Sequence, residues 1–491
     1  MTTAKPTRDN AWGEAWGEAT HRLAAGEARL VGLWADGAEV RMALSVGRPE
    51  LEFFHYAALD GSFPSVGVAH APAIRLERAI ADLSGLKARG APDARPWLDH
   101  GRWLVSHPLG AGAPTSGGAP KRYAFLGAEG VGLHQIPVGP VHAGIIEPGH
   151  FRFHASGETI VRLEERLGYV HKGVERLMAG ADVARGAQLA GRVSGDSTIA
   201  YQIAFARAVE AAGGIVAPPR AAWLRALMAE IERVANHLGD IGAICNDASF
   251  ALMHAHTGAL RELTLRAADH SFGHRLMMDC VTPGGVLVDL DRDRRTCLRE
   301  LTTTIRDKFP RLVELYDNTA SLQDRTVGAG RLDPELALRF GCGGVIGRAS
   351  GRDFDARRDH PYSPYDELRF ETPVWREGDV NARVWVRIRE VEESVRLIGQ
   401  ILDRLPVGPI RAEERQAAGR ASEGWALVEG FRGDVFAHVR LGDDGGIARC
   451  HLRDPSWFQW PLLEAAIEGN IVADFPLCNK SFNCSYSGHD L

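Results

Sequence analysis

The chain has 491 residues, of which 45% are hydrophobic and 24% are charged, and its formal net charge is −6. This length allows two or more domains with sizeable cores, and the composition is that of an ordinary globular protein. The negative charge argues against a dedicated nucleic-acid-binding protein, and no apolar run of about 18 residues predicts a membrane-spanning helix. Seven cysteines scattered over so long a chain do not form a disulfide framework, which favours a reducing cytoplasm.

Residues 12–103 form a first compositional unit with the features of a small α+β domain. The segment 26–46 predicts two strands around an Asp36-Gly37 turn, and the segment 51–59 predicts a third strand. Apolar residues at helical spacing predict a helix over 74–86. A Gly- and Pro-rich linker follows at residues 107–120, and its glycines lack the GK[ST] ending of a phosphate-binding loop.

The segment from Gly139 to Ala200 concentrates titratable residues on Gly- and Pro-broken stretches. His142, Glu147 and His150 are expected in loops or turns. The apolar residues that follow recur at spacings of three, four and seven, which predicts a helix from about residue 160 to residue 178. The motif R-x-S-G-x-S at 192–197 predicts a turn before a further amphipathic helix. Such loops backed by helices are typical of a buried redox or proton-transfer pocket.

The remainder of the chain is predicted to be mostly helical. Apolar stripes at helical spacing predict long core helices over 223–242 and 384–402. The segment 424–441 predicts a β-hairpin with Gly433 and Asp434 at or near its turn. Together these elements predict the α+β class, with a small N-terminal α+β domain before a mainly helical domain that contains a minor sheet.

The order of several segments resembles that of a known superfamily. These segments are GPVH…EPGHFRF, LGYVHKGVE, RVSGDS, EIERVANHLGDIG, SGRDFDARRDHPYSPYDEL, VEGFRG and a short Cys-bearing tail. They resemble the large subunit of membrane-bound, energy-converting [NiFe] hydrogenases of the formate-hydrogenlyase type. They are also similar to the homologous 49 kDa subunit of respiratory NADH–quinone oxidoreductase. The resemblance implies a 30 kDa-subunit-like domain at 1–106, a linker at 107–120 and the large-subunit-like domain at 121–491.

In the hydrogenase branch of this superfamily, two Cys-x-x-Cys pairs hold nickel and iron. In this chain the first pair falls on Ser194 and Ser197, and the second falls on Cys484 and Ser487. Serine hydroxyls are hard ligands that stay protonated at neutral pH, whereas the metals need soft thiolates. We therefore expect the metal centre to be lost and no cofactor to be bound by this chain, with a nickel–iron centre of altered ligation as the alternative.

The resemblance also implies roles for residues around the former metal site. Glu147 matches a carboxylate that gates proton transfer, and the alternative is a carboxylate that binds nearby backbone amides. Arg432 matches an arginine over the active site, where it would hold a substrate or a carboxylate, and the alternative is an ion pair. His142 and His150 match a loop that donates to a quinone headgroup, and structural histidines are the alternative. The headgroup tyrosine of the quinone-reducing branch is replaced by Gly195.

His171 and Lys172 match the region that faces an iron–sulfur cluster held by the small subunit. The resemblance thus implies a redox-module subunit of a membrane-bound, ion-translocating complex, with a quinone or another small acceptor in the vacated pocket. Expected partners are an iron–sulfur small subunit, a ferredoxin-like subunit and antiporter-like membrane subunits. The expected location is the cytoplasmic face of the membrane, where partners would anchor the chain. The alternatives are an active hydrogenase with altered ligation and a non-catalytic assembly scaffold.

Overall fold

The computed structural model describes residues 8–47, 49–111, 115–116, 122–142, 146–413 and 422–491. The chain opens with helix α1 (Arg8–Ala24), and an antiparallel sheet follows in the order β1 (Arg29–Asp36), β2 (Glu39–Ser45) and β3 (Leu51–Ala57). The turn between β1 and β2 contains Gly37, whose φ of 63° lies in the left-handed region that glycine adopts without strain. Helix α2 (Ile74–Ser84) ends at Gly85, also with a left-handed φ. The three predicted strands and the predicted helix of this unit are confirmed.

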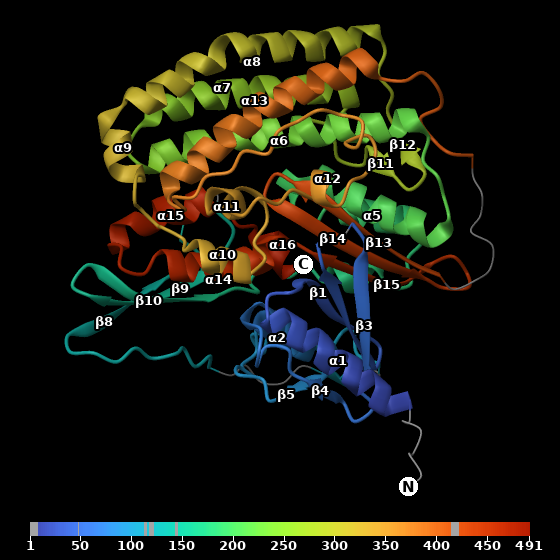
Figure 1. Ribbon diagram of the computed structural model, residues 1–491, viewed down its shortest axis with the longest axis vertical. Helices are drawn as coiled ribbons and strands as arrows, with labels where there is room; N and C mark the ends of the chain where they lie inside the picture. The colour runs from blue at the N-terminus through green and yellow to red at the C-terminus, as the bar shows by residue number, and fades with distance from the viewer. Residues whose placement is uncertain (1–7, 48, 112–114, 117–121, 143–145, 414–421) are drawn as a thin grey trace.

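A layer of long helices covers one side of the molecule. It comprises α6 (Pro219–Asp247), α7 (Ala251–Phe272), α8 (Arg292–Asn318) and α13 (Val380–Arg404), and Figure 1 shows these helices stacked at the top of the view. Helix α6 packs against both α7 and α13. The predicted core helices at 223–242 and 384–402 lie within α6 and α13 and are confirmed. Within the described residues, no helix combines the length and the apolar composition needed to cross a bilayer.

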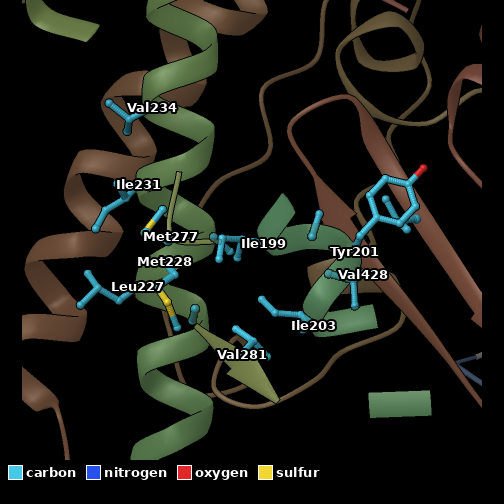
Figure 2. Packing of buried hydrophobic residues seen from close by; sticks show 14 of the residues in the cluster. Ile199, Tyr201, Ile203, Leu227, Met228, Ile231, Val234, Met277, Val281 and Val428 are labelled. Atoms are coloured by element: carbon cyan, nitrogen blue, oxygen red, sulfur yellow. The ribbon is translucent and has the colours of Figure 1, made fainter. Parts of the chain in front are cut away.

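Helix α5 (Thr198–Gly213) lies beneath this layer, between α6 and an antiparallel sheet of order β13 (Ser422–Gly430), β14 (Gly433–Leu441) and β15 (Ile447–Arg453). Figure 2 shows Ile203 of α5 in one cluster with Leu227 of α6 and Val428 of β13. The β13–β14 pairing confirms the predicted hairpin. Because Gly430 pairs with Gly433, Phe431 and Arg432 form the tip of the hairpin.

Shorter elements complete the fold. The short helices are α3 (Val174–Met178), α4 (Val183–Ala190), α9 (Ala320–Thr326), α10 (Pro334–Arg339), α11 (Gly344–Ala349), α12 (Ala356–Asp359), α14 (Ser456–Ala466), α15 (Phe475–Phe482) and α16 (Tyr486–Asp490). The remaining strands are β4 (Ser62–Pro64), β5 (Lys87–Arg89), β6 (Val105–Ser106), β7 (Thr115–Ser116), β8 (Leu133–Val138), β9 (His150–Ser156), β10 (Thr159–Arg166), β11 (Val281–Thr282) and β12 (Gly285–Val286). Mixed helices and small sheets confirm the predicted α+β class.

The helix predicted through residues 160–178 is wrong over its first half. Residues 159–166 form β10, which pairs with β9, and only Val174–Met178 are helical there. The register shifts between Ile160 and Arg162, so Ile160 pairs with Ala155 while Leu163 pairs with Phe153. This bulge turns two residues three positions apart toward the same face of the sheet. The resulting spacing imitates a helix. The same strand pairing corrects the expectation for His150, which begins β9 and does not lie in a loop.

The N-terminal unit shares its core with the rest of the chain. Trp34 of β1 stacks on His451 of β15, with ring centroids 4.9 Å apart. Beside them Arg453 donates a hydrogen bond to the carbonyl oxygen of Val31 at 2.8 Å, and Arg440 forms an ion pair with Asp36 at 2.7 Å. The domain boundaries at 106 and 120 stay a prediction.

Candidate functional site

A polar pocket of about 280 Å³ opens where the start of α5, the tip of the β13–β14 hairpin and the segment between α15 and α16 meet. It is lined by Ile146, Glu147, Ser194, Gly195, Asp196, Arg432, Asn479, Lys480, Asn483, Cys484, Ser485, Tyr486 and Ser487. The structure therefore brings the two predicted motifs together, although almost 300 residues separate them in the sequence. Of the predicted site residues, Glu147, Arg432, Ser194, Cys484 and Ser487 all line this one pocket.

Arg432 and Asp196 form a two-pronged ion pair in the wall of the pocket. The Arg432 Nη atoms donate to the two carboxylate oxygens of Asp196 at 2.7 and 2.6 Å, and Nη1 also donates to Ser197 Oγ at 3.0 Å. Its Nε donates to the carbonyl oxygen of Asn483. Burial works against ionisation of Asp196, but the guanidinium holds the pKa of this carboxyl below its ordinary value. The two Nη groups of Arg432, which were expected to hold a substrate or a carboxylate, therefore bind the carboxylate of Asp196.

The Ser194 hydroxyl, at a former ligand position, binds neighbouring side chains. Ser194 Oγ lies 3.1 Å from Ser485 Oγ and donates to Asp196 Oδ1 at 2.8 Å. Ser485 Oγ in turn accepts a hydrogen bond from the backbone N–H of Gly488 at 2.8 Å. Ser197 lies against Arg432 and does not line the pocket. The former ligand position Ser194 is therefore part of a hydrogen-bonded network that also includes Asp196 and Ser485.

The donor set of this pocket does not fit a nickel–iron centre. Cys484 supplies the only sulfur among the lining residues of this pocket, where a nickel–iron centre needs several thiolates. The hydroxyl, carboxamide and ammonium groups around it are hard or cationic and do not replace thiolates. Across the described parts of the chain, no group of three or more His, Cys, Asp or Glu residues is arranged to hold a metal ion.

Glu147 lies on the rim of the pocket, and its side chain is exposed. Its Oε2 accepts a hydrogen bond from the backbone N–H of Ser487 at 3.0 Å. This is the kind of backbone contact that the alternative interpretation of the residue describes. The contact also joins the loop before β9 to the C-terminal motif. A movement of the Glu147 side chain would therefore break the hydrogen bond to Ser487, a former ligand position.

The two histidines have different surroundings. His150 is buried, with Nδ1 3.1 Å from the carbonyl oxygen of Gly139, and its Nε2 accepts a long hydrogen bond of 3.4 Å from Arg152. His142 lies nearer the pocket, with its ring centroid 6.3 Å from that of Tyr486. Its Nε2 is buried and has no hydrogen-bond partner among the described residues. Burial lowers the pKa of His142, so the ring is neutral near pH 7.

His171 and Lys172 lie outside the lining of the pocket. The His171 ring stacks on Trp103 with centroids 4.5 Å apart, and its Nδ1 lies 2.7 Å from the carbonyl oxygen of Asp490. Lys172 Nζ donates to the carbonyl oxygens of Arg192 and Val193. These contacts attach the segment to the residues just before Ser194 and to helix α16. The expected role of these residues toward a partner's cluster stays a prediction.

Asp196 and Tyr486 are among the pocket residues that were not predicted from the sequence. Asp196 lies between the two serines of R-x-S-G-x-S, and Tyr486 lies between Cys484 and Ser487. The Tyr486 hydroxyl is buried and makes no hydrogen bond of good geometry with a described residue, although Asn479 lies beside it. Their positions inside the two spaced motifs were the available signal.

The fold and the pocket define an α+β scaffold in which the turn before the buried helix α5 meets a C-terminal motif. The family model described as "Respiratory-chain NADH dehydrogenase, 49 Kd subunit" matches residues 247–424. Formate hydrogenlyase subunit 5 of Escherichia coli is 33% identical, over 92% of this chain and 79% of that protein. The carbon monoxide-induced hydrogenase of Rhodospirillum rubrum is 32% identical, over 71% of this chain and 97% of that protein.

The respiratory branch and a solved structure match as well. An NADH-quinone oxidoreductase subunit of Desulfotalea psychrophila is 32% identical, over 69% of this chain and 92% of that protein. A chain in the structure of the membrane-bound sulfane sulfur reductase, an archaeal respiratory membrane complex, superposes with a TM-score of 0.68 and 28% identity, over 73% of this chain and 98% of that chain. The protein belongs to the family that unites formate-hydrogenlyase-type hydrogenase large subunits with the 49 kDa subunits of NADH-quinone oxidoreductase.

Proposed function

We propose that this chain is the redox-module large subunit of a membrane-bound, ion-translocating oxidoreductase complex, and that its pocket works without a nickel–iron centre. The single observation that carries the proposal is the hydrogen bond between Ser194 and Ser485, in a pocket whose lining residues include one cysteine, Cys484. Hydroxyl groups in this position bind polar organic groups far better than soft metals. The names of the relatives, which include hydrogenases and respiratory-complex subunits, support membership of such a complex.

The occupant that we propose for the pocket is a quinone headgroup. A headgroup of this kind presents two carbonyl oxygens, which need hydrogen-bond donors. His142 Nε2 is buried near the pocket without a hydrogen bond to any described residue. The buried Tyr486 hydroxyl has only Asn479 beside it among the described residues, without a hydrogen bond of good geometry. Buried polar groups are rarely left without partners, so such atoms favour a ligand or water at this position. Both ring nitrogens of His150 contact neighbouring groups, Gly139 and Arg152. His150 is therefore assigned a structural role at the start of β9.

Glu147 is proposed to exchange protons between the pocket and the surroundings. It lies on the rim and is exposed, and its contact with the Ser487 amide couples it to the former ligand motif. A carboxylate that can reach both solvent and substrate suits general acid–base transfer. Arg432 is proposed to position Asp196 and the segment 194–197 through its ion pair.

Electrons are proposed to arrive from an iron–sulfur cluster in a small-subunit partner that docks near His171 and Lys172. A ferredoxin-like subunit and antiporter-like membrane subunits complete the proposed complex. The proposed location is peripheral, on the cytoplasmic face of the membrane. The matches to named subunits of membrane-bound complexes support this assembly.

Two measurements on the purified complex test the proposal. Elemental analysis is expected to find far less than one nickel per chain, whereas stoichiometric nickel near Cys484 would establish the hydrogenase alternative. Reduction of a short-chain quinone is expected to fall about tenfold or more in Glu147→Gln and in Tyr486→Phe. Matched controls are Glu158→Gln on the exposed turn of the β9–β10 hairpin and Tyr169→Phe, whose side chain is 38% exposed. Equal rates in all variants and wild type would favour the scaffold alternative.

A further inference from the structure

A second cavity, of about 440 Å³, lies between α5, the start of α6 and the segment 362–367. Its apolar walls include Ile203 and Ala226, and its polar walls include Arg207 and Tyr362. None of its lining residues belongs to the pocket at Ser194. A volume of this size lies within the range of small-molecule sites.

Arg207 differs from the arginines around it. Arg225 forms an ion pair with Glu210 at 2.6 Å, and Arg357 forms one with Glu230 at 2.9 Å. Arg207 stacks over the ring of Tyr362, with its Cζ atom 4.3 Å from the ring centroid. No residue in the described part of the chain accepts a hydrogen bond from its guanidinium or forms an ion pair with it. Burial lowers the pKa of Arg207, but a guanidinium stays charged at neutral pH.

The carboxylates nearest to Arg207 do not pair with it. The Glu210 carboxylate accepts hydrogen bonds from both Nη groups of Arg225, at 3.1 and 2.6 Å. It also accepts one from the backbone N–H of Gly284 at 2.7 Å. Glu367, at the wall of the cavity, lies 3.7 Å from the guanidinium of Arg404, and the neighbouring Asp366 is exposed to solvent. Arg207 therefore leaves the cavity with one positive charge that no carboxylate of the described residues neutralises by direct contact.

The start of α6 forms one wall of the cavity. This helix of 29 residues begins at Pro219, and Pro218 before it provides no side-chain cap. Pro219 and Ala222 both line the cavity. Proline has no N–H, and the N–H of Ala222 donates to the carbonyl oxygen of Pro218 at 3.2 Å. Neither residue therefore offers a free donor to the cavity, and the binding of an anion rests on Arg207.

We propose that this cavity binds a small organic anion, with its carboxylate or phosphate against Arg207 and its apolar body against Ile203, Ala226 and the ring of Tyr362. A guanidinium binds such oxyanions through two parallel hydrogen bonds, and the apolar walls select ligands that carry a hydrocarbon or aromatic body. The proposal concerns a site separate from the pocket at Ser194 and is independent of the function proposed for that pocket.

Calorimetric titration of the full chain with benzoate, and with benzyl alcohol as its uncharged analogue, tests the proposal. Benzoate is expected to saturate one site with a Kd of about 1 mM or tighter, whereas benzyl alcohol is expected to bind at least about tenfold more weakly. The variant Arg207→Gln is expected to lose at least about tenfold in benzoate affinity, and Arg207→Lys is expected to lose less because it keeps the charge. The matched control Arg266→Gln, at a side chain that is 74% exposed on α7, is expected to bind as wild type does.

A second variant keeps the test decisive if the Arg207 variants do not fold. Ala222 is half-buried and lines the cavity, so Ala222→Leu would fill the space without removing the charge. This variant is expected to weaken benzoate binding about tenfold or more. Absence of saturable benzoate binding to wild type, or equal affinity in wild type and Ala222→Leu, would overturn the proposal.

Discussion

Arg432 at the tip of the β13–β14 hairpin holds Asp196, 236 residues earlier in the chain, by two hydrogen bonds of 2.7 and 2.6 Å. The pair joins the turn before α5 to the hairpin. Ser194 Oγ donates a hydrogen bond to Asp196, and Ser197 Oγ accepts one from Arg432. Because the guanidinium is almost fully buried, neither charge of the pair can be removed without consequences for the other. The geometry of the pocket therefore depends on this ion pair.

The first prediction concerns this pair. Asp196→Asn would leave the buried guanidinium of Arg432 without its counter-charge, and we expect the free energy of unfolding to fall by about 2 kcal/mol. Urea denaturation followed by circular dichroism would measure this change. Asp279→Asn is the matched control, because Asp279 forms a two-pronged ion pair with Arg192 at the surface. The side chains of Arg192 and Asp279 are 42% and 40% exposed. The control is expected to change stability by less than about 1 kcal/mol, and equal losses in both variants would contradict the role given to Asp196.

The second prediction is a pH dependence that arises from Glu232. Burial raises the pKa of this carboxyl to about 8, although it accepts hydrogen bonds from the backbone N–H groups of Ile199 and Ala200. The folded chain therefore keeps a proton on Glu232 at pH values at which the unfolded chain has released it. Between the unfolded pKa, about 4.3, and the folded pKa, about 8, this group makes stability fall as pH rises.

Glu232→Gln should remove this contribution, since the amide is neutral throughout. We expect its stability, measured by urea denaturation at several values between pH 5 and pH 8, to fall less steeply with pH than that of wild type. The difference in slope is about 1 kcal/mol per pH unit. Glu262→Gln, at a solvent-exposed carboxylate on α7, should leave the slope unchanged. Parallel profiles for wild type and Glu232→Gln would refute the assignment.

The fold was predictable from the sequence wherever the signals were local. The β1–β2 turn, helix α2 and the β13–β14 hairpin each follow from residues that are close together in the chain. The β9–β10 hairpin was missed because its bulge gave Ile160 and Leu163 a helical spacing. The candidate site was predictable only in part. The two motifs were visible, but a pairing between Arg432 and Asp196 depends on a fold that brings distant segments together.

A third prediction concerns the support of the hairpin tip by Gly344. This residue has a φ of 64°, and a Cβ atom added to it would lie only 2.0 Å from the carbonyl oxygen of Arg432. Gly344→Ala should therefore displace the tip and lower the free energy of unfolding by about 2 kcal/mol or more. Gly273→Ala provides the control, because Gly273 has a φ of 80° but no atom within 4 Å of the added Cβ. It should show only the conformational cost of about 1 kcal/mol, and thermal melts of the two variants would separate the clash from that cost.

The last prediction follows from the unpaired charge of Arg207. Arg207 is half-buried, and a partly desolvated charge without a carboxylate partner costs some stability. Replacing it with an apolar side chain of similar length removes this cost. Arg207→Met should keep the packing over Tyr362 and raise the free energy of unfolding by about 1 kcal/mol in the absence of ligand. Arg225→Met is the contrasting variant, because it leaves the carboxylate of Glu210 without its partner and should destabilise the chain by about 3 kcal/mol. Urea denaturation would measure both variants. A loss of stability in Arg207→Met as large as that in Arg225→Met would mean that the Arg207 guanidinium is a structural group, and the cavity would then have no spare charge to offer an anion.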